Sequence, residues 1–263
     1  MENDVTGQLT SEQRHAYREQ GIVYPLRVLT SAEAAGYRAE CDTLETLLGG
    51  RPRTVETRQM HLHFDWAYRL ATHPRVLDAA QCLLGPDLLV WATELFVKHP
   101  HDSNVLIGWH RDGPYMGLDP ALTVSAWIAL SPSVRANGCM CVVRESGRQT
   151  LRSKVPAEDA QIEEVSLQPG EMSLHDVYVL HGSRPNQSSE KRVGFTIRFT
   201  TPAGRPTSDR PPAILARGED HFGHFRLLDP PRQENTDGAL ARMKQSAREH
   251  LDATLENLKH AAR

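Results

Sequence analysis

The pattern of apolar and turn-forming residues changes at Asp87, and this change constrains the fold more than any other feature. Beyond it, short apolar runs are separated by Pro, Gly and Asn, which is the pattern of strands joined by turns. The runs that read as strands are residues 88–97, 122–130, 139–144, 162–167, 171–175 and 192–200. So many short strands favour a barrel or a sandwich, because these architectures leave few sheet edges exposed.

The part of the chain before Asp87 is predicted to be mostly helical. The predicted helices cover residues 10–20, the stretch from the Thr30 cap to Leu48, and residues 65–84 with a break at Pro74. Boundary signals support them: Thr10 or Ser11 and Gly21, Thr30 and Gly49-Gly50, and Gly85-Pro86. Residues 22–24 read as a strand between the first two helices. Helices followed by strands indicate an α+β fold.

After residue 200 we expect a loop and one long helix. Residues 202–212 are rich in proline and could form a lid. Residues 238–262 form a charged amphipathic helix, expected to pack on the barrel or on a second subunit. A length of 263 residues suits one large domain. The expected division is a single domain over 1–263, with a helical part (1–86), a strand-rich core (87–200), and a lid and C-terminal helix (201–263).

Charge and composition argue against several classes of protein. The 30 basic and 33 acidic side chains give a net charge of −3, unlike the basic surface of a nucleic-acid binder. No apolar run approaches the ~18 residues that span a membrane, and the polar start of the chain does not resemble a signal peptide. The four cysteines show no Cys-x-x-Cys spacing, which favours reduced thiols. We expect a cytoplasmic protein without nucleic-acid or membrane partners; its oligomeric state stays open, a homodimer included.

Two histidines and an aspartate give the strongest functional signal. His110 and Asp112 stand two residues apart, and His181 follows seventy-one residues after His110. In a strand, His110 and Asp112 would point to the same face, and His181 would arrive from another strand or its loop. Two imidazoles and one carboxylate form the facial triad that binds non-haem Fe(II) and leaves positions open for substrates and oxygen. The alternative is a hydrogen-bonded surface pair of His110 and Asp112.

Other histidines compete for the role of metal ligand. His175, six residues before His181, is the main rival for the third position and is otherwise expected to hydrogen-bond near the site. Two further motifs have metal-like spacing but no carboxylate at a matching position: His61-x-His63 and His99-Pro100-His101.

Arg192 begins a segment in which polar and apolar residues alternate. The apolar set, expected to pack against the helices, is Val193, Phe195, Ile197 and Phe199. Arg192, Thr196 and Arg198 would then face the interior. A buried arginine without an anion is costly, so Arg192 is expected either to bind an anionic ligand or to pair with an internal carboxylate. For Arg198 a structural role and a substrate role stay equally open.

These motifs together resemble the phytanoyl-CoA dioxygenase family, in its small bacterial branch that modifies small metabolites. The resemblance rests on Trp109-His110-x-Asp112, on residues 123–131 and 137–140, and on residues 169–174 leading to His181-Gly182-Ser183 and Arg192. The chain departs from the family at Val143-Arg144-Glu145-Ser146-Gly147, where the family often reads Pro-Gly-Ser-His.

The resemblance implies a double-stranded β-helix (jelly-roll) core and an enzyme that needs Fe(II), 2-oxoglutarate and molecular oxygen. It assigns the iron to His110, Asp112 and His181. It assigns 2-oxoglutarate to Arg192, which would grip the distal carboxylate, and to Ser183, Trp127 and Lys98. The implied reaction hydroxylates, or otherwise oxidises, an unactivated C–H bond of a small metabolite. Related halogenases have a small residue at the carboxylate position, so Asp112 favours hydroxylation over halogenation.

Two alternative functions remain at this stage. One is a cupin-like metal enzyme that does not use 2-oxoglutarate, and the other is a non-catalytic ligand-binding barrel. Arg192 argues against the first, and the intact triad together with Arg192 argues against the second. The sequence does not identify the primary substrate, and the region around Arg144 and residues 202–225 are expected to set selectivity.

Overall fold

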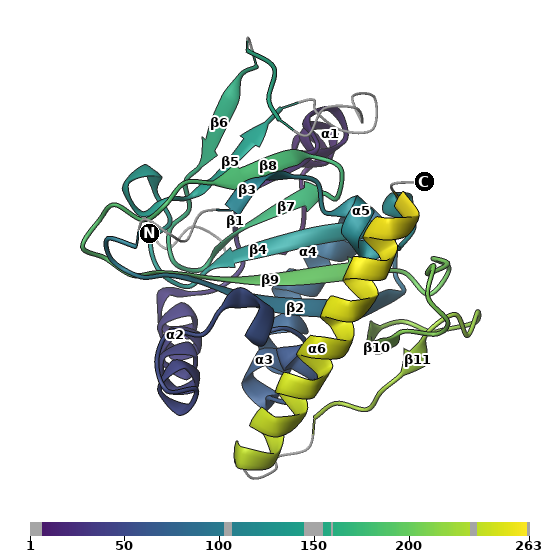
Figure 1. The fold of residues 1–263 in the computed structure, drawn as a ribbon. Helices are drawn as coiled ribbons and strands as arrows, with labels where there is room; N and C mark the ends of the chain where they lie inside the picture. Colours follow the sequence, from purple (N-terminus) through teal and green to yellow (C-terminus); the bar gives the residue numbers. More distant parts are fainter. Residues whose placement is uncertain (1–6, 103–106, 145–154, 159, 232–235, 262–263) are drawn as a thin grey trace.

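Two β-sheets lie one above the other at the centre of the molecule (Figure 1). The computed structural model describes residues 7–102, 107–144, 155–158, 160–231 and 236–261. The larger sheet contains, in spatial order, β1 (Ile22–Arg27), β7 (Glu171–Asp176), β4 (Thr123–Ala129), β9 (Arg192–Thr200), β2 (Leu88–Lys98), β10 (Pro212–Arg217) and β11 (Arg226–Leu227). The smaller sheet contains β3 (Ile107–His110), β8 (Leu180–Ser183), β5 (Met140–Val143) and β6 (Ile162–Val165). This arrangement confirms the predicted α+β fold with a jelly-roll core.

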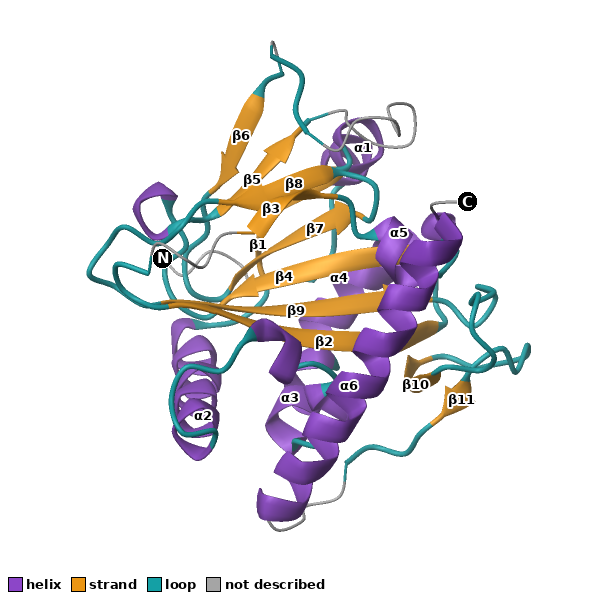
Figure 2. Ribbon diagram, viewed as in Figure 1, coloured by secondary structure: helices purple, strands orange, loops and turns teal. Residues whose placement is uncertain are grey.

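Helices cover one face of the larger sheet (Figure 2). The helices of the described residues are α1 (Ser11–Gln20), α2 (Ser31–Leu47), α3 (Asp65–Ala71), α4 (Pro74–Leu84), α5 (Gly113–Met116) and α6 (Thr236–Ala261), with short 3-10 turns η1 (Thr54–Glu56), η2 (Met60–Leu62), η3 (Pro120–Leu122) and η4 (Arg135–Asn137). The cover on this face comes mainly from α2, α3 and α4. The predicted boundary residues act as expected. Thr10 and Thr30 each form a capping box, Gly21 ends α1 at a φ of 77°, and Pro74 begins α4.

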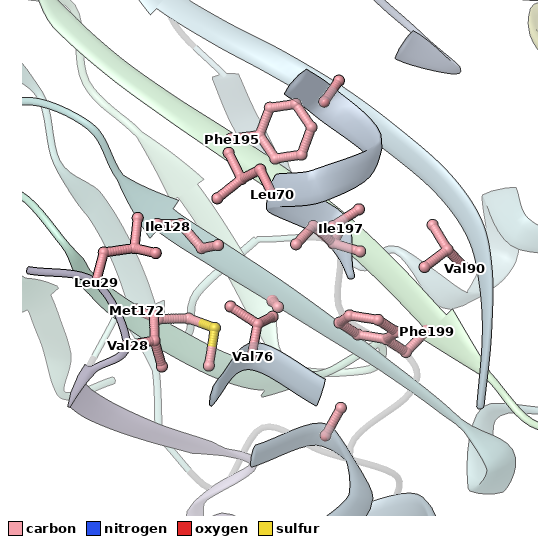
Figure 3. Packing of buried hydrophobic residues seen from close by; sticks show 14 of the residues in the cluster. Val28, Leu29, Leu70, Val76, Val90, Ile128, Met172, Phe195, Ile197 and Phe199 are labelled. Carbon is pink, nitrogen blue, oxygen red and sulfur yellow. The ribbon is translucent and has the colours of Figure 1, made fainter. Parts of the chain in front are cut away.

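The main core lies between this face of the sheet and the helices. Val193, Phe195, Ile197 and Phe199 all project from β9 into it, as the alternating sequence predicts. They pack with helix residues such as Leu70 of α3 and Val76 of α4 (Figure 3). The other face of β9 is therefore free to line the space between the two sheets.

Four strands were not predicted from the sequence. β3 and β8 have four residues each and carry glycine and histidine instead of a regular apolar alternation, so only their pairing with each other and with β5 makes them strands. β10 and β11 lie in the region predicted to be a loop. The larger sheet therefore takes β1 from before the predicted core of 87–200 and β10 from after it. No helix among the described residues is long and apolar enough to cross a membrane.

Candidate metal centre and its two cavities

The structure brings His110, Asp112 and His181 together. His110 ends β3 and lies opposite His181 in the neighbouring strand β8. One ligand atom of each of the three residues lies within 4.8 Å of the other two, and within the described ranges no other such group of metal-ligating side chains was found. The two imidazole centroids are 4.2 Å apart. The predicted triad is thus assembled from segments that are far apart in the sequence.

Asp112 reaches this position in a different way from the one expected. Strand β3 ends at His110, and Asp112 has the helical backbone angles φ −67° and ψ −38° at the start of α5. The turn brings Gly113 against the ring of Tyr178, where a Cβ would lie 2.8 Å from a ring carbon. The expectation that His110 and Asp112 share one face of a strand was therefore wrong. A turn into a short helix, which glycine permits, directs the carboxylate towards the imidazoles.

Both imidazoles present the same nitrogen to the centre. Nδ1 of His110 lies 2.8 Å from the carbonyl oxygen of Gly108, and Nδ1 of His181 lies 3.0 Å from that of Val179. A carbonyl can only accept, so Nδ1 must carry a proton, and Nε2 is the nitrogen left to bind a metal ion. Burial lowers the pKa of His181 to about 3, which keeps this imidazole neutral. Neutral imidazoles with Nε2 directed inward are suited to bind a metal ion.

Asp112 is ionised and held by several donors. Ser125 donates a hydrogen bond to its Oδ2 at 3.0 Å, and Arg198 donates one to its Oδ1 at 3.3 Å. Burial alone would raise the pKa of Asp112, but the charge of Arg198 and the nearby imidazoles hold it well below its usual value. The carboxylate is therefore available as an anionic ligand.

A buried network of charges extends from Asp112 into the larger sheet. Arg198 also donates to Glu94 at 2.7 Å, and Nε of Arg58 lies 2.5 Å from the other oxygen of Glu94. The charges of Arg198 and Arg58 outweigh burial and lower the pKa of Glu94. Two arginines and two carboxylates thus alternate along one wall. Arg198 has the structural partners that the sequence left open, and it also lines the cavities described below.

The rival histidines lie elsewhere. His175 is buried close by, but its Nε2 is 4.0 Å from Oδ2 of Asp112 and it lies outside the three-residue group. Nδ1 of His61 lies 3.1 Å from the hydroxyl of Thr93, whereas His63 contacts Ser246 of α6. Nε2 of His99 lies 2.6 Å from a carboxylate oxygen of Glu45. The motifs containing His61 and His99 thus serve packing between elements.

One cavity, with about 450 Å³ of empty volume, connects the triad to Arg192. Arg192 donates to the carbonyl of Gly138 at 2.5 Å, and its guanidinium carbon lies 5.2 Å from the centroid of the Trp127 ring. No carboxylate among the described residues pairs with it, and its Nε has no hydrogen-bond partner there. Burial lowers the pKa of Arg192 to about 10, so it stays positively charged. The described residues thus leave this cation without an anionic partner.

The other residues predicted to bind 2-oxoglutarate lie around Arg192. Trp127 and Ser183 line the same cavity, and a Cβ at Gly194 would overlap the Trp127 ring, so glycine makes room for it. Lys98 lies behind Ser183 and donates to its hydroxyl at 2.6 Å and to the carbonyl of Gly138 at 3.2 Å. Burial and the charge of Arg192 lower the pKa of Lys98 to about 7. Lys98 therefore supports the cavity wall rather than lining the cavity.

A second cavity, with about 760 Å³ of empty volume, opens on the other side of His110 and Asp112. Its remaining lining residues, which sequence reasoning missed, include Thr54, Arg58, Trp91, Tyr115, Met116, His250 and Thr254. His250 and Thr254 belong to α6, so this helix forms a wall of the site in addition to packing on the barrel (Figure 1). Since these residues come from four separate parts of the chain, no local pattern could have grouped them.

Comparisons with known proteins agree with this geometry. The model of the family described as phytanoyl-CoA dioxygenase matches residues 17–194. The 1-deoxypentalenic acid 11-beta-hydroxylase of Streptomyces arenae is 27% identical over 209 residues, which are 65% of this chain and 73% of that protein. The solved structure of the non-heme monooxygenase ThoJ in its apo form is 33% identical, with a TM-score of 0.81, and the match covers 94% of this chain and 99% of that one.

Two further structures have bound groups in their descriptions. The ThoJ nickel complex is 34% identical with a TM-score of 0.79, and the match covers 94% of this chain and 99% of that one. CytC3 with Fe(II) and alpha-ketoglutarate is 19% identical with a TM-score of 0.69, over 85% of this chain and 94% of that one. At that identity the likeness shows a shared fold.

Proposed function

The chain belongs to the phytanoyl-CoA dioxygenase family of Fe(II)- and 2-oxoglutarate-dependent oxygenases, and on this premise we propose how its residues divide the work. His110, Asp112 and His181 hold the iron. Arg192 holds the distal carboxylate of 2-oxoglutarate, Ser183 adds a hydroxyl, and Trp127 and Lys98 shape the pocket around it. The primary substrate is a small molecule that enters the second cavity.

The donor set fits the metal. Two neutral imidazoles with inward Nε2 atoms and one ionised carboxylate are ligands that suit Fe(II) and leave one side of the ion open. Support also comes from the ThoJ nickel complex, because nickel is a divalent ion that accepts the same imidazole and carboxylate donors.

Arg192 is the single observation that carries the 2-oxoglutarate assignment. It is a buried cation without a carboxylate partner among the described residues, and it shares a cavity with the triad. A guanidinium binds a carboxylate through two parallel hydrogen bonds. A dianion with one end at the metal and the other at Arg192 would offset the positive charge of the metal centre and that of the guanidinium.

Bound together, iron, 2-oxoglutarate and oxygen supply an oxidising chemistry that hydroxylates a C–H bond while 2-oxoglutarate is converted to succinate. The protein orients the reactants and restricts water. Asp112 occupies the position that halogenases leave open, so hydroxylation is the expected outcome. The relative from Streptomyces arenae is named for a hydroxylation, which supports this assignment.

The test is succinate formation. Protein loaded with Fe(II) should convert 2-oxoglutarate to succinate with oxygen uptake, faster in the presence of a substrate found by screening small molecules. A metal-dependent reaction indifferent to 2-oxoglutarate would favour the cupin-like alternative, and ligand binding without succinate would favour a non-catalytic barrel. We place the enzyme in the cytoplasm, in keeping with its four free cysteines.

A further inference from the structure

Arg58 has donors that its surroundings do not use. Its side chain is 16% exposed and lines the second cavity. Its one close partner is Glu94, in an ion pair that lacks hydrogen-bond geometry, since Nε and Nη1 have no hydrogen-bond partner among the described residues. Arg192 in the first cavity also has an Nε without a hydrogen-bond partner, but unlike Arg58 it has no carboxylate beside it among the described residues. The second cavity therefore has its own guanidinium able to accept an anion.

The charges around Arg58 change when the site is loaded. Without metal, Arg58 and Arg198 are balanced by Glu94 and Asp112. Iron carries two positive charges, which Asp112 and the metal-binding carboxylate of 2-oxoglutarate offset. Two arginines then share Glu94 as their one remaining carboxylate. With iron and 2-oxoglutarate bound, this wall of the cavity has one positive charge in excess. A ligand with a single negative charge would neutralise it.

Three other charged residues line the second cavity, and they pair with one another: Arg198 donates to both Glu94 and Asp112. The apolar and aromatic residues that line this cavity are Trp91, Phe96, Ile107, Tyr115 and Met116. His250 lines it from α6, with Nδ1 2.9 Å from Nε2 of Gln59, and burial lowers the pKa of His250 to about 4, so it brings no charge. The aromatic and aliphatic walls thus suit an apolar body. Arg198 is engaged by two carboxylates, so Arg58 is the lining cation with unused donors that can distinguish an anion from a neutral group.

We infer that the second cavity binds a substrate with a carboxylate on an apolar body, and that Arg58 is the residue that recognises the carboxylate. This inference rests on the proposed function, because it uses the charge of the bound iron and of 2-oxoglutarate. One planar guanidinium edge and one excess positive charge match a carboxylate, which has two oxygens in a plane and one negative charge. The carboxylate at Arg58 would fix the position of the substrate body relative to His110 and Asp112, which line the same cavity.

Three probes with one skeleton test the charge preference: adamantane-1-carboxylate, adamantane-1-carboxamide and 1-aminoadamantane. Each is titrated into protein loaded with Fe(II) and saturating 2-oxoglutarate in the absence of oxygen, and binding is followed by calorimetry and by the tryptophan fluorescence of the protein. The carboxylate should bind about ten- to a hundredfold more tightly than the carboxamide, as for a charge-assisted hydrogen bond, and the amine should bind most weakly.

The matched variants are Arg58→Gln and Arg53→Gln. Arg58→Gln should abolish the preference for the carboxylate over the carboxamide. Arg53, five residues earlier, has a side chain that is 78% exposed, and its variant should keep the preference. If Arg58→Gln fails to fold, the comparison of the three probes on the unaltered protein still tests whether the second cavity prefers a carboxylate.

Four results would overturn the inference: equal binding of carboxylate and carboxamide, a preference for the amine, no binding of the carboxylate, or its displacement of 2-oxoglutarate, which would put the anion at Arg192. Failure of the proposed function looks different. In that case the charge-transfer absorption of the iron complex with 2-oxoglutarate would not form before any probe is added.

Discussion

At the scale of single residues, the properties of the site depend on which buried arginines are paired with carboxylates of the protein. Arg192 contacts a carbonyl and a ring face, and Arg198 contacts two carboxylates, although both project from the same face of β9. The carboxylates Glu94 and Asp112 raise the pKa of Arg198, whereas burial lowers that of Arg192. The two arginines therefore differ in function: one is satisfied by the protein itself and the other is complete only with a ligand.

Arg192→Lys should weaken the binding of 2-oxoglutarate about ten- to a hundredfold, because an ammonium group cannot reproduce two parallel hydrogen bonds. Iron binding should persist, since Arg192 is not one of the three metal-ligating residues. The measurement is a titration of 2-oxoglutarate into the Fe(II) protein without oxygen. Arg205→Lys, at an exposed position, is the control. Unchanged affinity in Arg192→Lys would mean that Arg198 or Lys98 holds the carboxylate.

Metal affinity should depend on pH through His110. Burial lowers the pKa of His110, but the carboxylate of Asp112, with Oδ1 3.7 Å from Nε2, more than compensates, so the pKa of His110 is raised above 6.5. A metal ion must displace this proton, and affinity should fall about tenfold per pH unit below the raised pKa. His181, with a pKa of about 3, does not contribute in that range. Fe(II) titrations between about pH 6 and about pH 8 measure the effect; an affinity independent of pH over this range would contradict it.

The three residues that we propose as metal ligands could be grouped from the sequence, because the chemistry restricts their types and their order along the chain. Arg58 and His250 could not. Arg58 follows η1 in a segment without helical or strand periodicity, and His250 lies among charged residues of α6 that resemble any solvent-exposed helix face. Tertiary packing alone brings them to the second cavity.

At the scale of elements, regular patterns were predicted well and short ones were not. β9 has nine residues and a strict alternation, so its bounds and its two faces followed from the sequence. β3 and β8 have four residues each, and the residues that make them functional also break the apolar pattern. The turn at Gly113 was missed for a related reason: it is specified by the contact with Tyr178, which lies in a distant part of the chain.

The dependence of β9 on its helical cover can be measured. Phe195 has no exposed surface and packs against Trp66, with ring centroids 6.0 Å apart. Phe195→Ala should lower the free energy of unfolding by about 3–5 kcal/mol, because it leaves a cavity in the core. Leu255→Ala, at a residue that is 47% exposed on α6, should change it by less than about 0.5 kcal/mol. Urea unfolding of both variants tests this, and equal losses would contradict the account of the core.

At the scale of the whole molecule, both ends of the chain contribute to one sheet. β1 pairs with β7, and β10 pairs with β2 on the other side of the sheet. We therefore propose that residues 1–263 form one domain. The site lies between the two sheets, with its ligands on the smaller sheet and on α5, and with Arg192 and Arg198 on the larger one.

Such a chain should unfold in a single transition, and its stability should rise when the site is filled. At a concentration a hundred times its dissociation constant, a ligand adds about 2.7 kcal/mol to the free energy of unfolding. Fe(II) and 2-oxoglutarate should each raise the free energy of unfolding. In Arg192→Lys the increase from Fe(II) should be unchanged, and the increase from 2-oxoglutarate should be smaller. Urea unfolding without oxygen, with and without each ligand, measures both. Two separate transitions would argue against a single domain.

The central claim, that His110, Asp112 and His181 bind iron, is tested most directly by anaerobic titration of Fe(II) into three proteins. These are the unaltered protein, His181→Ala and His175→Ala, each checked for folding by circular dichroism. The account predicts stoichiometric binding to the unaltered protein and to His175→Ala, and loss of that binding in His181→Ala, because a missing ligand leaves the metal face incomplete. Stoichiometric binding to His181→Ala together with loss in His175→Ala would show that the third ligand is His175, and the account of the site would be wrong.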